Sequence, residues 1–166
     1  MEEENKQEEN NKNVPTLRFP GFTDAWEQRK LGDCFTERSE RSAKGELISV
    51  TINAGVVKAS SLERKDNSSE DKSSYKVVCK GDIAYNSMRM WQGASRCSPY
   101  NGILSPAYTV IIPRENISSK FFAIMFKKHN RIQLFQRNSQ GLTSDTWNLK
   151  FPALKTIKII VPEVEE

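Results

Sequence analysis

The residues best suited to bind another molecule lie in one short segment, directly after an apolar, strand-like run. Five polar or aromatic side chains fall within seven positions there: Asn86, Ser87, Arg89, Trp91 and Gln92. An arginine can donate a bidentate pair to guanine O6 and N7, and a glutamine or asparagine can match adenine N6 and N7. A tryptophan can stack on a base. This combination predicts nucleic-acid recognition.

Further candidates lie outside this segment. Three basic side chains could hold phosphates, namely Lys58, Arg96 and Arg137. A second polar patch covers residues 139–148 and contains a glycine, so its backbone could approach a phosphate closely. The candidates in this patch are Thr143, Ser144 and Asn148.

Several of these residues also have a purely structural explanation. Trp91 and Trp147 are as well suited to packing in the core or against a loop as to stacking on a base. Asn86 can end a strand by hydrogen-bonding its own backbone, and we favour this over base contact. Arg89 could pair with an acidic neighbour instead of DNA.

The sequence contains little on which catalysis could depend. No glycine-rich phosphate loop follows a strand, and no Ser or Cys nucleophile has a recognisable motif around it. Residues 98–100 and 105–108 match the Asn/Asp-Pro-Pro-aromatic motif of adenine methyltransferases too poorly to serve as that element. Residues 70–72 offer carboxylates beside a lysine, but they lie in a polar stretch typical of solvated surface. We expect no enzyme activity.

Composition and charge favour an intracellular domain with a polyanionic partner. The 166 residues suit one domain, and no apolar window is long enough for a membrane span. Three cysteines and one histidine show no metal-ligand spacing, so we expect neither a metal nor a cofactor in this chain. Residues 1–13 are acidic and predict a disordered tail, whereas residues 14–162 carry a net charge of +10. Such a basic domain favours a polyanionic partner. A start rich in glutamate is unlike a signal peptide, which predicts a cytoplasmic location.

Apolar periodicity predicts a single α+β domain with a mixed or antiparallel sheet as its core. One principal helix is expected at about 119–137, with Lys127 and Lys128 on its solvated face and Gly141 as its terminator. A short helical turn is expected over residues 24–32. The strand-like runs are 47–57, 75–79, 83–85, 107–112 and 156–161.

Several segments, in order and spacing, resemble a known family: the target recognition domain of the specificity subunits of type I restriction-modification systems. They cover residues 14–162, nearly the whole expected fold. The segments are Val14-Pro15-x-Leu17-Arg18-Phe19-Pro20-Gly21-Phe22 with Trp26-Glu27-Gln28-Arg29-Lys30-Leu31-Gly32, Gly81-Asp82-Ile83 with Met88-Arg89-x-Trp91-x-Gly93-Ala94, Gly102-Ile103-x-Ser105-Pro106-Ala107-Tyr108, and Leu142-Thr143 with Ile157-x-Ile159-x-Val161-Pro162.

The resemblance implies that residues 14–166 form a DNA target recognition domain. It implies double-stranded DNA, adenine methyltransferase subunits and a motor-nuclease subunit as partners, with S-adenosylmethionine, ATP and magnesium used by those subunits. In the family, two such domains joined by long helices read the two halves of a bipartite target. This chain stops where the first long helix would begin, so we expect an isolated, monomeric recognition domain.

Two other functions remain open at this stage. The chain could be a protein-interaction module that docks a methyltransferase subunit, with DNA contact incidental. It could also be one part of a fused methyltransferase-nuclease, although no cofactor motif would place activity here. The family's sequence-reading positions vary, so the site residues above are predictions from side-chain chemistry alone.

Overall fold

A four-stranded antiparallel sheet is the central layer of the fold. The computed structural model describes residues 14–63 and 68–163. The sheet has the strand order β2-β9-β6-β7, which are Phe35–Glu37, Tyr108–Pro113, Ile83–Asn86 and Ser95–Cys97. In β6, Ile83 and Tyr85 face one hydrophobic cluster, and Ala84 between them faces another. The period-two alternation of a strand therefore buries this sheet on both faces.

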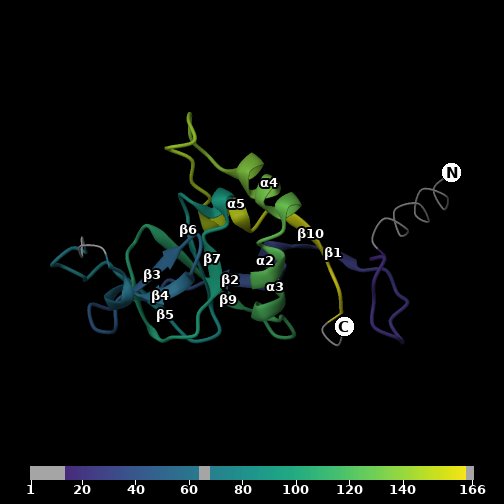
Figure 1. Cartoon of the computed structure of the whole chain (residues 1–166), viewed down its shortest axis with the longest axis horizontal. Helices are drawn as coiled ribbons and strands as arrows, with labels where there is room; N and C mark the ends of the chain where they lie inside the picture. Colours follow the sequence, from purple (N-terminus) through teal and green to yellow (C-terminus); the bar gives the residue numbers. More distant parts are fainter. Residues whose placement is uncertain (1–13, 64–67, 164–166) are drawn as a thin grey trace.

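Two antiparallel strand pairs, one of them a hairpin, cover one face of the central sheet. They are β3 (Ile48–Thr51) with β4 (Gly55–Lys58), and β5 (Lys76–Val78) with β8 (Gly102–Leu104), both antiparallel. A 3-10 turn, η1 (Ala59–Ser61), follows β4. Apolar side chains of these strands join Ala84 and Val110 in the smaller cluster. In Figure 1 these strands lie on the opposite side of the central sheet from the helices.

Helices cover the other face and form the larger hydrophobic cluster. The two longer ones are α3 (Ser119–Met125) and α4 (His129–Asn138), and the single-turn helices are α2 (Leu31–Cys34) and α5 (Phe151–Leu154). Phe35, Phe122, Phe126 and Phe135 pack together in this cluster with ring centroids 4.9–6.4 Å apart, edge to face except for the tilted Phe35–Phe126 pair. The first and last strands, β1 (Glu27–Lys30) and β10 (Lys158–Val161), pair antiparallel beside α3 (Figure 1).

The α+β class and the antiparallel sheets agree with the prediction, but one continuous helix over 119–137 is wrong. The chain turns at Phe126 and restarts after Lys128, whose backbone is extended at φ −67° and ψ 138°. This turn lets Phe126 and Phe135 both reach the same cluster with no exposed surface. No glycine or proline lies between α3 and α4, so the sequence carries no local signal for the break.

The helical turn predicted over residues 24–32 is also wrong. Residues 27–30 form β1 because they pair with β10, a contact distant in sequence that overrides local propensity. Gly32 does not stop a helix but lies inside α2, where its N–H donates to the Lys155 carbonyl at 3.0 Å. A Cβ at Gly32 would lie 3.0 Å from that carbonyl oxygen, so the glycine permits this approach. The predicted tail, residues 1–13, lies outside the described residues.

A bidentate ion pair joins the end of β2 to the turn before β6. Arg38 donates from Nε and Nη2 to the Asp82 carboxylate at 2.7 and 3.0 Å, and these bonds raise the pKa of Arg38. The Asp82 carboxylate also accepts from the Cys79 N–H at 2.9 Å and is 3% exposed. Asp82 is therefore a structural residue that fixes where β6 begins.

We expect Arg38→Ala to lower the free energy of unfolding by about 3 kcal/mol, because it leaves the buried Asp82 carboxylate without its counter-charge. Arg38→Lys should lower the free energy of unfolding by less, since lysine keeps the charge but not the bidentate geometry. Urea unfolding measures both, with Lys44→Ala, an exposed lysine, as the control. Equal stability of Arg38→Ala and Lys44→Ala would contradict this role.

Candidate nucleic-acid interface

The segment after β6 forms two tight turns that present side chains outward. The Asn86 side-chain oxygen accepts from the Met88 N–H at 3.0 Å, and the Arg89 N–H donates to the Asn86 carbonyl at 2.9 Å. A short 3-10 turn, η2 (Met90–Gln92), follows and ends at Gly93, which has a left-handed φ of 81°. Asn86 thus makes the backbone contact that we favoured from the sequence.

Arg89 and Gln92 remain available on this turn. Gln92 is exposed and Arg89 is half-buried. Neither side chain has a hydrogen-bond or ion-pair partner within residues 14–63 and 68–163. The acidic partner considered for Arg89 is therefore not found in the described part of the chain. The side chains with the best match to guanine and adenine edges are both accessible.

Ser87 is not available for contact. Its side chain is 5% exposed, and its hydroxyl shares a 2.7 Å hydrogen bond with the Thr109 hydroxyl on β9. Its carbonyl accepts from the Leu149 N–H at 2.8 Å. The prediction that Ser87 contacts DNA is contradicted by this burial, and the residue instead anchors the chain after the second polar patch.

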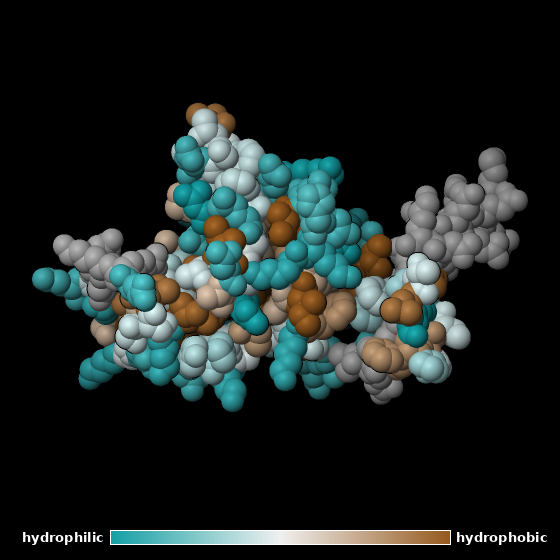
Figure 2. Space-filling view, viewed as in Figure 1, coloured by the Kyte–Doolittle hydropathy of each residue, from teal (hydrophilic) through white to brown (hydrophobic). Residues whose placement is uncertain are grey.

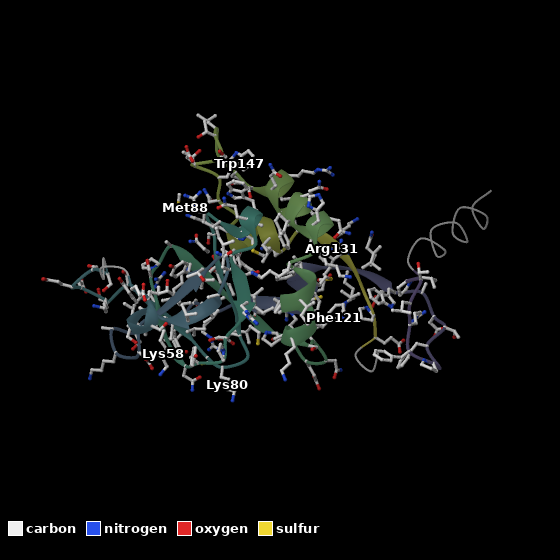
Figure 3. All side chains as sticks on the ribbon, in the orientation of Figure 1. Lys58, Lys80, Met88, Phe121, Arg131 and Trp147 are labelled. Atoms are coloured by element: carbon white, nitrogen blue, oxygen red, sulfur yellow. The ribbon has the colours of Figure 1, made fainter. Side chains whose placement is uncertain are left out.

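The two tryptophans join the two polar patches. Trp91 and Trp147 meet edge to face, with ring centroids 5.3 Å apart and an interplanar angle of 78°. Trp91 also donates from Nε1 to the Met88 carbonyl at 3.0 Å. Met88 and Trp147 lie at the same edge of the molecule in Figure 3. Both rings therefore pack against one another, which is the loop-packing alternative for these residues.

Residues 139–148 form a projecting loop beside η2 (Figure 1). At the base of the loop, Gln140 and Asn148 exchange two backbone hydrogen bonds of 2.8 Å. The candidate Asn148 is half-buried there. Thr143 and Ser144 are exposed near its outer end. Arg137 precedes the loop in the last turn of α4 and is exposed, with no partner in the described residues.

Lys127 ties η2 to the β3–β4 hairpin, a role that the sequence did not reveal. Its Nζ donates to the carbonyls of Gly93 and, at 3.5 Å, Ile52. Burial lowers the pKa of Lys127, and the nearby Arg96 guanidinium lowers it further. We predicted a solvated helix face for this lysine because the helix was taken as continuous. Lys127 is exposed, as predicted, but it lies in the turn between α3 and α4, where its Nζ can reach two carbonyls.

The two remaining phosphate candidates differ in their surroundings. Arg96 on β7 is exposed, and its side chain packs against Gly55. A Cβ at residue 55 would lie 2.5 Å from the Arg96 Cδ. Lys58 is paired with Glu46 at 3.0 Å, lies 5.4 Å from the Tyr100 ring centroid, and sits at the far edge from Met88 in Figure 3. Arg96 therefore remains a candidate, whereas Lys58 is paired and distant from η2.

Arg131 is a cationic side chain that the sequence reasoning did not select. It lies on α4, which packs against η2, and burial lowers the pKa of its guanidinium. Its Nε has no hydrogen-bond partner in the described residues. Over residues 83–162 the sequence has eleven lysines and arginines but only two acidic residues, Glu115 and Asp145. The half of the chain that builds η2, α4 and the loop is thus strongly basic.

Neither a metal-binding cluster nor a membrane-spanning helix occurs in the part of the chain that the structure describes. Residues 14–63 and 68–163 contain no group of three or more His, Cys, Asp or Glu side chains arranged to hold a metal ion. Within the same ranges, no helix combines the length and apolar character that crossing a bilayer requires.

Comparison with known proteins identifies a family. The family described as Type I restriction modification DNA specificity domain matches residues 23–166. No curated protein matches the sequence. A crystal structure of the HsdS subunit from Thermoanaerobacter tengcongensis is similar at a TM-score of 0.48 and 13% identity, over 98% of this chain and 39% of that one. The chain thus spans well under half the length of that solved protein.

We expect Lys127→Met to loosen η2, because the Gly93 and Ile52 carbonyls lose their shared donor. The free energy of unfolding should fall by about 1 kcal/mol, and the amides of residues 92–94 should exchange faster. Denaturant unfolding and amide hydrogen exchange measure these effects. Lys128→Met is the matched control, since Lys128 is exposed and its side chain has no partner in the described residues. If both variants show the same exchange at 92–94, Lys127 does not hold this turn.

Proposed function

The chain belongs to the family of type I restriction modification DNA specificity domains, and we propose that it binds a short, defined sequence in double-stranded DNA through η2 and the loop of residues 139–148. Members of this family supply DNA specificity rather than catalysis. The recognition domain comprises residues 14–166 in this proposal and acts in the cytoplasm, where the DNA is.

One observation carries the proposal. The contact between Trp91 and Trp147 brings two polar segments, separated by about fifty residues, into one surface at the most basic part of the chain. Arg89 and Gln92 project from that surface without partners in the described residues. Contacts to phosphates from Arg137 and Arg96 would orient the domain, and contacts to base edges from Arg89 and Gln92 would select the sequence.

The family also suggests protein partners. We propose that adenine methyltransferase subunits bind this domain and that a motor-nuclease subunit joins through the complex. S-adenosylmethionine, ATP and magnesium would then act in those subunits and not in this chain. A lone recognition domain, monomeric in this proposal, makes few DNA contacts, so its affinity alone should be low and should rise with the methyltransferase present.

Selection from a random duplex library tests the proposal directly. The protein is used alone and with the cognate methyltransferase, and bound duplexes are sequenced. A single enriched half-site in either sample supports sequence-specific binding. Unenriched duplexes in both samples, at low salt, would exclude it. Affinity for the enriched site should fall steeply with salt, with a log–log slope of roughly −0.9 for each phosphate contacted.

Arg89→Ala should weaken binding to the enriched site and relax its preference at one base pair, with a loss of about 1–3 kcal/mol of discrimination there. Competition binding against duplexes with each single base-pair change measures this. The control is Lys80→Ala, because Lys80 is an exposed cation at the opposite edge of the molecule (Figure 3). An equal loss on every sequence, with a salt slope smaller by about 1, would make Arg89 a phosphate contact instead.

A groove away from this surface favours a second candidate function, docking of the methyltransferase subunit. The groove lies between β1, β10 and the start of α3, has a volume of about 720 Å³, and is lined by Phe121 and Phe122 with Arg29 and Glu163. Phe121 lies well apart from Met88 and Trp147 in Figure 3. A protein bound there would leave η2 and the loop free for DNA.

Arg29→Glu should weaken capture of the methyltransferase at least about tenfold, because it reverses a charge at the groove. Lys44→Glu, an equal change at an exposed lysine outside the groove, should have no such effect. Both variants should keep the DNA preference of the parent protein. Titration of labelled methyltransferase measures capture, and unchanged affinity for Arg29→Glu would place docking elsewhere.

A further inference from the structure

Leu142 lies alone at the outer end of the projecting loop. Its side chain is 100% exposed, and Figure 2 shows a small hydrophobic cap at this end above hydrophilic and near-neutral residues. Single exposed leucines are common on protein surfaces, so exposure by itself assigns no role. A role for Leu142 is instead indicated by the fixed shape of its loop and by the polar residues that surround it.

Hydrogen bonds within the loop hold Leu142 outward. Beyond the paired backbones of Gln140 and Asn148, the N–H groups of Thr146 and Trp147 both donate to the Thr143 carbonyl, at 3.0 and 3.1 Å. The Thr146 hydroxyl also accepts from the Thr143 N–H at 3.2 Å. The loop therefore has a formed shape, so that presenting Leu142 to a ligand needs little further ordering.

A glycine makes this shape possible. Gly141, directly before Leu142, has a φ of +136°, and a Cβ there would lie 2.7 Å from the Thr146 carbonyl oxygen. Side chains rarely adopt such a backbone conformation, so the loop closes only because residue 141 has none. The backbone conformation at Gly141 thus directs the chain so that Leu142 points away from the protein.

The surroundings of Leu142 suit DNA better than a protein partner. The loop around it is polar, with Thr143, Ser144 and Asp145 all exposed, and Trp147 packs it beside the turn that carries Arg89. A protein-docking surface needs a contiguous apolar patch, and one leucine does not make one. An apolar tip flanked by hydrogen-bonding side chains, with the cations Arg89 and Arg137 on the neighbouring η2 turn and α4, fits a groove whose walls are polar or phosphate.

The major groove contains one apolar group that such a tip could contact without distorting the duplex, the C5-methyl of thymine. The groove is wide enough to admit a two-stranded ribbon, and this loop is narrow at its base, where Gln140 and Asn148 form one antiparallel bridge. We propose that the loop of residues 139–148 enters the major groove and that Leu142 contacts a thymine methyl, which makes it a specificity-determining residue. The proposal rests on the DNA-binding function proposed above.

Replacing thymine by deoxyuridine removes only the methyl group and tests this contact. Each thymine of the enriched half-site is replaced singly, and affinity is measured with the methyltransferase present. One replacement should weaken binding of the parent protein about fourfold, the value for one buried methyl group. For Leu142→Ala the same replacement should have no effect, because the side chain that senses the methyl is gone.

Leu17→Ala is the matched control. Leu17 is 93% exposed, and its segment lies at the far end of the molecule from the loop (Figure 1). This variant should keep the fourfold response of the parent protein. Because both leucines are exposed, neither substitution should affect folding, and thermal unfolding verifies this.

Distinct results overturn the inference without overturning the proposed function. If parent and Leu142→Ala respond alike to every replacement while binding the enriched site, Leu142 does not read a thymine methyl. A rise in 2-aminopurine fluorescence that needs Leu142 would show unstacking, and the side chain would then be a wedge between bases. Weaker methyltransferase capture with no change in the thymine response would make it a protein contact. Absence of any enriched site would instead refute the proposed function itself.

Discussion

The position of the candidate interface depends on the pairing of β6 with β9 and β7 in the middle of the central sheet. Both edges of β6 are hydrogen-bonded, and both of its faces are buried, by Ile83 and Tyr85 on one side and Ala84 on the other. A one-residue slip in register would exchange these faces, so the register is strongly specified. The point at which the chain leaves the sheet, and hence the place of η2, follows from this constraint.

The surface built on this strand combines rigid support with exposed side chains. Ser87 bonds Thr109 on β9 and accepts the Leu149 N–H, so both polar segments are attached to the sheet at one place. Lys127 and the tryptophan pair then hold η2 and the loop against each other. Because Ser87, Lys127 and the tryptophan pair make these attachments, Arg89 and Gln92 can differ without loss of the fold. This separation of scaffold from contact residues suits a DNA specificity domain, in which loop side chains on a rigid scaffold would make the contacts.

The sequence was a good guide to elements whose apolar pattern is local and a poor guide to those made by distant contacts. The runs around β5, β6, β9 and β10 were predicted because β-branched and aromatic residues repeat with strand periodicity. The strand at 27–30 was missed, since its partner lies 128–134 positions away, and the helix over 119–137 was wrongly taken as unbroken. For the candidate site, Arg89 and Gln92 were selected by their side-chain chemistry, whereas the burial of Ser87 and the bonds of Lys127 depend on contacts that no spacing in the sequence reveals.

The sequence by itself determined the basic charge, the lack of catalytic motifs, the family resemblance and the two polar segments, because these depend on residue types and their order. Tertiary structure alone decided that the two segments share one surface, which of their side chains point outward, and that Leu142 is held at the tip of a formed loop. The physical reason is that exposure and proximity result from packing between distant residues. A chain can specify such packing only as a whole, through the sheet register and the buried contacts that bring its segments together.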